Sequence, residues 1–327
     1  MAMPGKTNSL TDVSGIAVGQ AEAADAKTGV TVILPDSRAV CAVDVRGGGP
    51  GTRETDALKL GTLVDEVDAI VLSGGSVYGL AAADGVAAEL GAQGKGFALR
   101  DAPGVPRSPV IPSAILYDLA NGGDKSWGAE PPYNRLGRDA LSKAGQTFAL
   151  GRAGAGYGAL AGSRQGGLGS ASMVTDDGYT VGAMVAVNCF GSVTVPGSEA
   201  YWAAPYEVGA EFGGLPFPDS FAFDPEDWGA AKLNPAPGTN TTIAIVATDA
   251  DLTPSETQRL ADMAVAGMAR AIRPVFAPFD GDVVFGLSTG EKPASAPRPL
   301  LIARLGELAA STLARAIARG VYEADKT

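Results

Sequence analysis

The sequence predicts an α+β protein built as a four-layer αββα sandwich, with two layers of strands between layers of helices. Two observations favour this fold class. Apolar runs of strand length end at glycine or proline, and amphipathic helical segments lie between some of them and after the last. The order of these segments also lacks the regular strand–helix repeat of a doubly wound sheet. The chain has 327 residues, of which 46% are hydrophobic. We therefore expect a single domain over residues 1–327, large enough to be a catalytic domain.

The first part of the chain reads as mixed strands and helices. We expect strands at 28–35, 39–49, 67–75 and 113–119, helices at 78–90 and 134–145, and a pair of strands or one bent strand at 180–195.

The last part of the chain has the clearest helix start. Thr253 fits the N-cap, Pro254 the first helical position, and Glu256 completes a capping box. Apolar residues then recur every three or four positions as far as Ile272, which predicts one helix packed on a sheet. Strands are expected at 241–250 and 282–290, and a final helix at 300–321.

Residues 196–240 form a segment of different character. They are rich in proline, glycine, acids and aromatic residues, and support neither the helical nor the strand period. Such a long structureless segment is uncommon in a compact domain and is usually functional or disordered. We therefore expect a flexible segment directly before the strand at Thr241.

Composition excludes several classes of function. The chain has no histidine, which rules out a Ser-His-Asp triad and a histidine-based zinc site, so an enzyme would need another base, such as a carboxylate, a lysine or a free α-amine. The net charge of −11, with scattered Lys and Arg, argues against nucleic acid as a partner. No apolar stretch is long enough for a signal peptide or a membrane span, so a cytoplasmic location is expected.

The glycine clusters do not match nucleotide-binding motifs. Gly154, Gly156 and Gly158 give G-x-G-x-G rather than G-x-G-x-x-G, and no P-loop is present. Ser76 lacks both the G-x-S-x-G spacing and a histidine partner, so it is interpreted as structural. The two cysteines, Cys41 and Cys189, lie in apolar runs and are expected to be buried thiols. We expect no cofactor and no metal.

Asn240-Thr241-Thr242 lies where the aperiodic segment meets an apolar strand. It can be an ordinary strand start, or a glycosylation sequon, which matters little without a secretory signal. In a protein without histidine, however, a nucleophilic hydroxyl is best placed at a new N-terminus, where its own α-amine accepts the proton. Thr241 suits that role.

Asp280-Gly281-Asp282 precedes another predicted strand. With alternating side chains, the two carboxylates would share one face and perturb each other, so that one holds a proton while the other stays ionised. A solvated acidic turn is the alternative.

Several blocks together resemble a known family. DVRGGGPGTRETDAL, LSGGSVYGLAAADGV, GRAGAG with QGGLGSAS, NTTIAIVAT and FDGDVVFGLSTG are similar to the L-aminopeptidase/D-esterase (DmpA-like) family, which includes β-peptidyl aminopeptidases and 6-aminohexanoate-oligomer (nylon) endohydrolases. The resemblance implies an N-terminal-nucleophile-hydrolase-like fold of the DmpA/ornithine acetyltransferase type. It also implies self-cleavage into an α chain, 1–240, and a β chain, 241–327.

The resemblance assigns roles to individual residues. Thr241 matches the nucleophile, and threonine together with Asp280 and Asp282 points to the nylon-hydrolase type. Tyr117 and Asn188 match the residues that flank the nucleophile and donate to an oxyanion.

One position departs from the family pattern. Members commonly carry a lysine after GAG, where this chain reads GAGYGALAGSRQGG. Arg164, with its neighbour Ser163, is then a possible substrate or charge contact, or simply a solvated surface residue. Arginine does not deprotonate and so cannot serve as the base.

The predicted function is thus a self-processing N-terminal-threonine amide hydrolase that resembles the nylon-oligomer endohydrolases. One alternative is an aminopeptidase that requires a free amine on its substrate. An alternative of another class is a nonenzymatic small-molecule binding protein. Small or oligomeric amides are the expected partners, no membrane is expected, and the resemblance implies a tetramer of αβ units.

Overall fold

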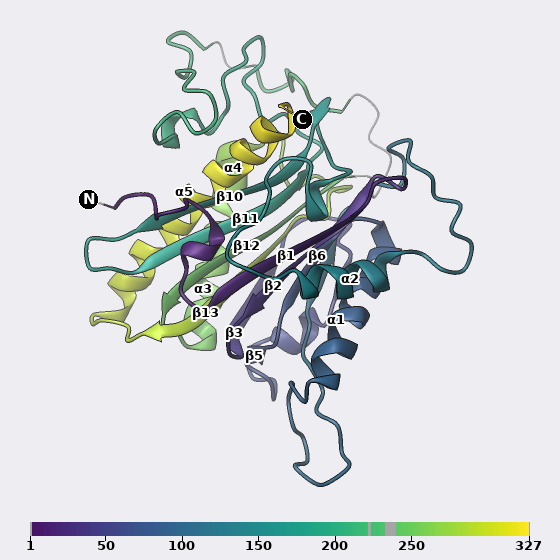
Figure 1. The fold of residues 1–327 in the computed structure, drawn as a ribbon. Helices are drawn as coiled ribbons and strands as arrows, with labels where there is room; N and C mark the ends of the chain where they lie inside the picture. The colour runs from purple at the N-terminus through teal and green to yellow at the C-terminus, as the bar shows by residue number, and fades with distance from the viewer. Residues whose placement is uncertain (1, 222–223, 233–239, 327) are drawn as a thin grey trace.

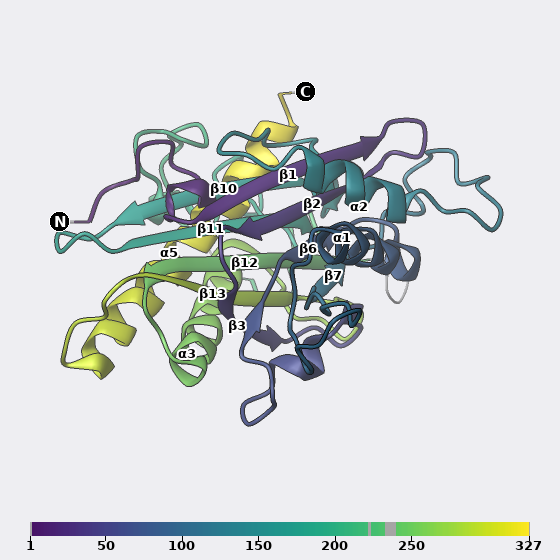
Figure 2. The ribbon, with the colours of Figure 1, turned by 60° about the horizontal axis from the view of Figure 1, so that its bottom comes forward.

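Two β-sheets lie face to face between two layers of helices (Figures 1 and 2). This arrangement is seen in a computed structural model that describes residues 2–221, 224–232 and 240–326. The first sheet has the order β1-β2-β6-β7-β4 and the second has the order β10-β11-β12-β13-β3-β5. The predicted αββα sandwich is confirmed.

The first sheet and its helices come from the N-terminal half. The strands are β1 (Ile16–Ala23), β2 (Thr28–Pro35), β6 (Ile70–Ser73), β7 (Ser113–Ile115) and β4 (Thr52–Arg53). The helices α1 (Ala81–Ala92) and α2 (Tyr133–Ser142) cover its outer face, where Val30, Val71, Val86 and Leu136 share one core.

The second sheet is formed mainly by the C-terminal half. Its strands are β10 (Gly167–Val174), β11 (Thr180–Asn188), β12 (Thr241–Ala250), β13 (Val283–Lys292), β3 (Ala39–Val45) and β5 (Glu66–Val67). The helices α3 (Pro254–Ala264), α4 (Ala266–Ala271) and α5 (Arg298–Ala324) cover its outer face. A short hairpin, β8 (Leu160–Ala161) and β9 (Arg164–Gln165), and five 3₁₀ turns complete the assigned elements of the described residues.

Strand β12 is buried on both faces because it lies in the middle of the second sheet. Ile243 and Ile245 point into the core between the sheets, whereas Ala244 and Val246 point toward the helices. This alternation explains why the segment reads as a continuous apolar run. Its first residue, Thr241, is buried and pairs with Asn188 of β11.

Several predicted elements differ from the structure in extent. The single strand expected at 67–75 is wrong, because the chain there forms β5 in the second sheet and then β6 in the first. The capping box at Thr253 is confirmed, but the helix it starts is interrupted at Val265, where Met268 N–H bonds to the Val265 carbonyl in a tighter turn. The predicted strand at 180–195 ends at Asn188, because the chain beyond it turns to pair with other segments, including a bridge from Ser192 to Arg273.

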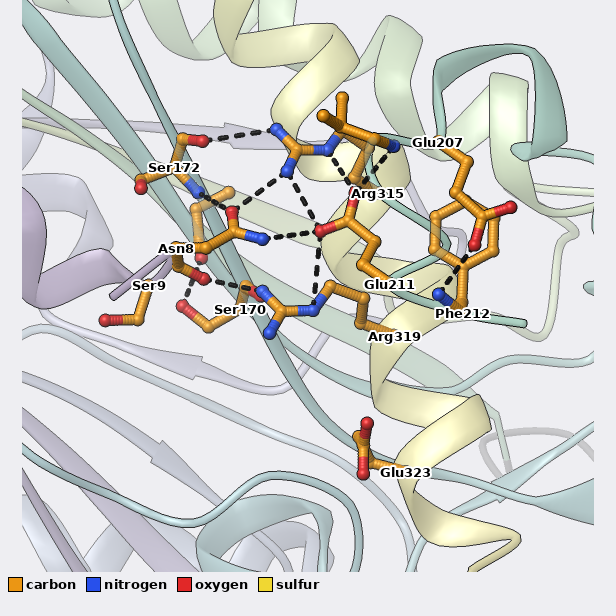
Figure 3. Close-up of polar contacts among 12 residues, drawn as sticks. Asn8, Ser9, Ser170, Ser172, Glu207, Glu211, Phe212, Arg315, Arg319 and Glu323 are labelled. Carbon is orange, nitrogen blue, oxygen red and sulfur yellow. Dashed lines mark hydrogen bonds and ion pairs between the residues drawn. The ribbon is translucent and has the colours of Figure 1, made fainter. Parts of the chain in front are cut away.

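The described part of 196–240 is anchored although it has little regular structure. Tyr201 and Phe212 are buried in the core beneath α5. Glu211 sits in a cluster that we call the clasp, made of Asn8, Glu211, Arg315 and Arg319 (Figure 3). Its carboxylate accepts hydrogen bonds from the Arg315 guanidinium at 2.5 and 2.9 Å and from the Asn8 amide at 2.6 Å. The clasp therefore ties the N-terminal segment and the 196–221 region to α5.

None of the helices in these described ranges is long and apolar enough to cross a membrane.

Candidate active site

Thr241 lies at the start of β12, directly opposite Asn188 of β11. Its side chain is buried, with a residue exposure of 3%. The hydroxyl donates a short hydrogen bond to the carbonyl oxygen of Asn240. The hydroxyl oxygen is thus held beside the peptide group that joins Asn240 to Thr241.

The Asn240 carbonyl has a second donor, which the sequence analysis did not identify. The backbone N–H of Gly281 donates to it at 3.1 Å. A side chain could not be accommodated there, because a Cβ on Gly281 would lie 2.7 Å from both the Thr241 hydroxyl oxygen and the Gly49 carbonyl oxygen. The glycine between the two aspartates allows this N–H to approach the Asn240 carbonyl. An N–H aimed at a carbonyl oxygen stabilises negative charge that develops there.

Asp280 and Asp282 lie immediately before β13, next to Thr241 and Asn240. Asp280 accepts hydrogen bonds from the N–H groups of Phe190 at 3.4 Å and Ala277 at 3.1 Å. Asp282 accepts from Thr242 at 2.8 Å and Phe276 at 3.2 Å. The structure therefore places both carboxylates around the start of β12.

The electrostatic environment of the two aspartates favours protonation. Both are buried, and burial raises the pKa of each carboxyl. The negative charge of Asp280 raises the pKa of Asp282 further. Two coupled carboxyls in one buried site share protons, so the pair can hold one proton and still carry a negative charge.

A glycine run at residues 47–49 packs against the backbone of the acidic pair. The N–H groups of Arg46 and Gly49 donate to the carbonyls of Asp282 and Asp280, at 2.9 and 2.7 Å. Gly47 lies so close to the backbone of the pair that no Cβ would fit. The block DVRGGGPG thus provides the close backbone approach that fixes Asp280 and Asp282.

Asn188 and Tyr117 are brought to the same end of the sheet. The Asn188 amide donates to the Tyr117 carbonyl at 3.0 Å, and its oxygen accepts from Leu160 N–H at 2.9 Å. The contact between the two residues therefore runs through the Tyr117 backbone. Their predicted role as donors to an oxyanion stays a prediction.

Arg164 is engaged elsewhere. Its guanidinium forms ion pairs with Glu199 at 2.7 Å and with Asp325 at 2.6 Å, and no ion pair in the described ranges joins it to Asp280 or Asp282. The exposed Ser163 beside it donates its N–H to the Ala230 carbonyl at 2.7 Å. Their contact with substrate stays a prediction.

A cation that the sequence analysis missed lies near the acidic pair instead. The half-buried Lys232 donates from its ammonium to the Asn188 carbonyl at 3.3 Å. Burial raises the pKa of the Asp280 carboxyl, and the positive charge of Lys232 offsets part of that rise. One signal in the sequence could have drawn attention to it: Lys232 is the single Lys or Arg in the acidic stretch 196–240.

The remaining sequence features have structural roles. Cys41 and Cys189 are free and buried, as predicted. Gly154 and Gly156 form part of a 3₁₀ turn, not the start of a long helix. In the portion of the chain that the structure describes, no group of three or more Cys, Asp or Glu side chains is placed to hold a metal ion.

Comparison with known proteins identifies the family. The model of peptidase family S58 matches residues 8–327. An uncharacterized aminopeptidase of Mycobacterium tuberculosis is 40% identical, covering 97% of this chain and 94% of the relative. A 6-aminohexanoate-oligomer endohydrolase of Kocuria is 32% identical, covering 86% of this chain and 74% of the relative.

Solved structures show the same fold. A β-aminopeptidase from Burkholderia matches with a TM-score of 0.69 at 23% identity, over 98% of this chain and 88% of that one. The L-aminopeptidase D-Ala-esterase/amidase of Ochrobactrum anthropi, described as a variant of the Ntn hydrolase fold, matches with a TM-score of 0.70 at 20% identity. That match covers 98% of this chain and 87% of the other.

The family match leaves no place for the alternative of a nonenzymatic binding protein. It agrees with the resemblance that the motifs around Thr241 and Asp280 indicated. The chain belongs to peptidase family S58 and is a hydrolase that acts on amide bonds.

Proposed function

We propose that the chain is a self-processing amide hydrolase that cuts its own Asn240–Thr241 bond and then uses Thr241 as an N-terminal nucleophile. The observation that carries the proposal is the arrangement around one carbonyl. The Asn240 carbonyl is held between the Thr241 hydroxyl and the Gly281 N–H, beside a buried acidic pair. Nucleophile, oxyanion donor and candidate base thus meet at a single peptide bond.

The first reaction is an acyl shift within the chain. The Thr241 hydroxyl oxygen attacks the Asn240 carbonyl carbon, and its proton passes to the ionised member of the acidic pair. The negative charge on the carbonyl oxygen is stabilised by Gly281 N–H. Collapse breaks the C–N bond as the acidic pair gives a proton to the Thr241 nitrogen, which leaves an ester and a free amine.

Water completes the cut. It attacks the ester carbonyl, releases the Thr241 hydroxyl and leaves Asn240 with a free carboxylate. We assign the base for the initial attack to the acidic pair, because the Thr241 nitrogen is an amide until the C–N bond breaks and cannot accept the proton.

In the mature enzyme the base changes. The free α-amine of Thr241 has an ordinary pKa of about 7.7–8.0, so it can accept the hydroxyl proton near neutral pH. The substrate acyl group then forms an ester on Thr241, and water releases it. The predicted donors Asn188 and Tyr117 would join Gly281 in stabilising the oxyanion.

Intact-mass spectrometry tests the proposal. We expect the wild-type protein to give two chains that end at Asn240 and begin at Thr241. Thr241→Ala should remain a single chain, and Thr241→Ser, which keeps the hydroxyl, should still be cut. A wild-type protein that stays at 32.8 kDa would overturn the proposal.

Two classes of substrate fit the proposed site. Threonine as nucleophile and the Asp280-Gly281-Asp282 sequence favour an endo-acting amidase similar to the 6-aminohexanoate-oligomer endohydrolases. The 40% identity to an aminopeptidase over nearly the whole chain favours the second candidate, an exopeptidase. Hydrolysis of matched amides with free and acetylated amines separates them, since only an exopeptidase requires the free amine.

We also propose that the cut protein assembles as a tetramer of αβ units in the cytoplasm. Light scattering of the purified protein checks the assembly, and cell fractionation checks the location.

A further inference from the structure

The backbone around Lys232 is held by two neighbouring segments, 162–163 and 189–190, which also bond to each other. Lys232 N–H donates to the Phe190 carbonyl at 3.0 Å, and Gly162 N–H donates to the Cys189 carbonyl at 3.0 Å. Ser163 N–H reaches the Ala230 carbonyl at 2.7 Å. These bonds hold residues 230–232 alongside the chain that leaves β11, so the position of the Lys232 ammonium is set by the fold.

The ammonium is directed to the end of β11 at which Thr241 is paired. It donates to the Asn188 carbonyl at 3.3 Å, and Asn188 is the register partner of Thr241. Phe190, whose carbonyl binds Lys232, donates its own N–H to Asp280 at 3.4 Å. Two short connections, through Asn188 and through Phe190, therefore link Lys232 to the nucleophile and to the acidic pair.

Aromatic rings pack against Phe190, whose backbone bonds to both Lys232 and Asp280. The Phe190 ring contacts the Trp228 and Phe279 rings edge to face, with centroids 5.6 and 4.8 Å away. Apolar side chains between charged groups lower the local dielectric and strengthen the action of one charge on another.

Among the described residues, the groups that act on the charge of Lys232 are Cys189 and Asp280. Burial lowers the pKa of Lys232 to about 8, while the neighbouring Cys189 and Asp280 act to raise it. Burial raises the pKa of Asp280, and the ammonium offsets part of that rise, while the negative charge of Asp280 raises the pKa of Asp282. The positive charge of Lys232 thus acts on Asp280, the nearer of the two carboxyls in the chain of contacts through Phe190.

We propose that Lys232 is the positioning cation of this site, which keeps Asp280 ionised, leaves the shared proton on Asp282, and so sets the pH range in which Thr241 is activated. An opposite charge stabilises the ionised form of the nearer carboxyl, and the remaining proton then favours the other. The inference rests on the proposed function, because it concerns the base that acts before the cut.

Self-cleavage as a function of pH tests this role. The full chain is synthesised in vitro and its conversion is followed by intact mass between about pH 5.5 and 9, a range that brackets the expected titration of a buried carboxyl. The variants are Lys232→Met, which removes the charge, and Lys232→Arg, which keeps it. Lys143→Met, at an exposed lysine at the end of α2, is the matched control.

We expect the acid limb of the Lys232→Met profile to move up by about one pH unit or more, because Asp280 loses its neighbouring cation. Cleavage at the midpoint of the wild-type acid limb should slow about tenfold in consequence. Lys232→Arg should keep the wild-type limb, as should Lys143→Met.

Three results overturn the proposal. The first is a Lys232→Met profile that matches the wild type. The second is slower cleavage in both Lys232 variants with an unshifted limb and a lowered Tm, which would show a purely structural contact. The third is a wild-type chain that stays uncut at every pH, which overturns the proposed function itself, and this inference falls with it. The first two results leave the self-cleavage of the wild type intact, so the two failures are distinguishable.

Discussion

The molecule contains buried carboxyl side chains at two places, the clasp and the acidic pair, which differ in the hydrogen-bond partners of their carboxyl oxygens. In the clasp, the Glu211 carboxylate is met by two guanidinium groups and an amide, and the Glu211 and Arg315 side chains are 7% and 2% exposed (Figure 3). At the acidic pair, Asp280 and Asp282 are met mainly by neutral backbone N–H groups. Burial therefore raises the pKa of both aspartates.

The difference separates a structural role from a chemical one. A carboxylate paired with guanidinium groups forms charge-assisted hydrogen bonds that hold the fold together. A buried carboxyl without such a partner has a pKa closer to working pH, which suits proton transfer. The clasp should therefore determine stability, and the acidic pair should determine reaction rate.

The largest expected effect is on the reaction. Asp280→Asn removes the ionised member of the pair, which accepts the Thr241 hydroxyl proton, and we expect self-cleavage to slow by about 100-fold or more. The conversion of the single chain into two, followed by intact mass, measures this. Normal cleavage in this variant would show that the buried pair is as structural as the clasp.

The clasp should show the reverse pattern. Glu211→Gln leaves Arg315 and Arg319 without their anionic partner. We expect the free energy of unfolding to fall by about 3–5 kcal/mol in consequence. Urea unfolding in a Thr241→Ala background, which keeps the chain in one piece, measures the loss. Self-cleavage of Glu211→Gln itself should stay near the wild-type rate; a large loss of rate without a loss of stability would contradict the comparison.

A smaller effect is expected on how the stability of the folded protein depends on pH, and Asp282 determines its sign. Burial gives Asp282 a higher pKa in the folded protein than the value of about 4 that an aspartate has in the unfolded chain. Its contribution to stability is therefore present below about pH 4 and is lost as the pH rises through the folded-state pKa. Thr241→Ala should therefore lose stability relative to the double variant Thr241→Ala/Asp282→Asn as pH rises from about 4 to 8, by roughly 1–3 kcal/mol. Urea midpoints across this range measure it, and an opposite slope would show that Asp282 has a lowered pKa.

A surface pair provides the smallest effect. Arg304 and Asp177 lie 2.9 Å apart with side chains 44% and 41% exposed, and the guanidinium lowers the pKa of Asp177 to about 2. Water screens such a pair, so Asp177→Asn should cost under about 1 kcal/mol. The same urea assay measures the loss of unfolding free energy. A loss as large as that of Glu211→Gln would show that burial does not explain the difference between the clasp and a surface pair.

Local patterns in the sequence were sufficient for much of the fold. The capping box at Thr253 and the apolar run after Thr241 depend on neighbouring residues, and both are confirmed in the structure. The interruption at Val265 was not predictable, since the apolar period continues through it. The four-layer arrangement also followed from the order of the elements.

The site was predictable only where its residues belong to motifs. Thr241, Asp280 and Asp282 lie in recognisable blocks, and the structure brings them together around the Asn240 carbonyl. Lys232 lies in an aperiodic segment, and its contact with Asn188 spans 44 positions of sequence. No local pattern encodes such a contact, which explains why the sequence directed attention to Arg164 instead.

The place of β12 and β13 in the second sheet has a consequence for the cut protein. Both strands follow Asn240, yet β11 and β3, which precede it, flank them on either side. Cleavage would therefore turn one chain into two subunits that share a single sheet, and unfolding would become a dissociation governed by mass action. The unfolding midpoint of the cut protein should rise with protein concentration, whereas that of Thr241→Ala should not.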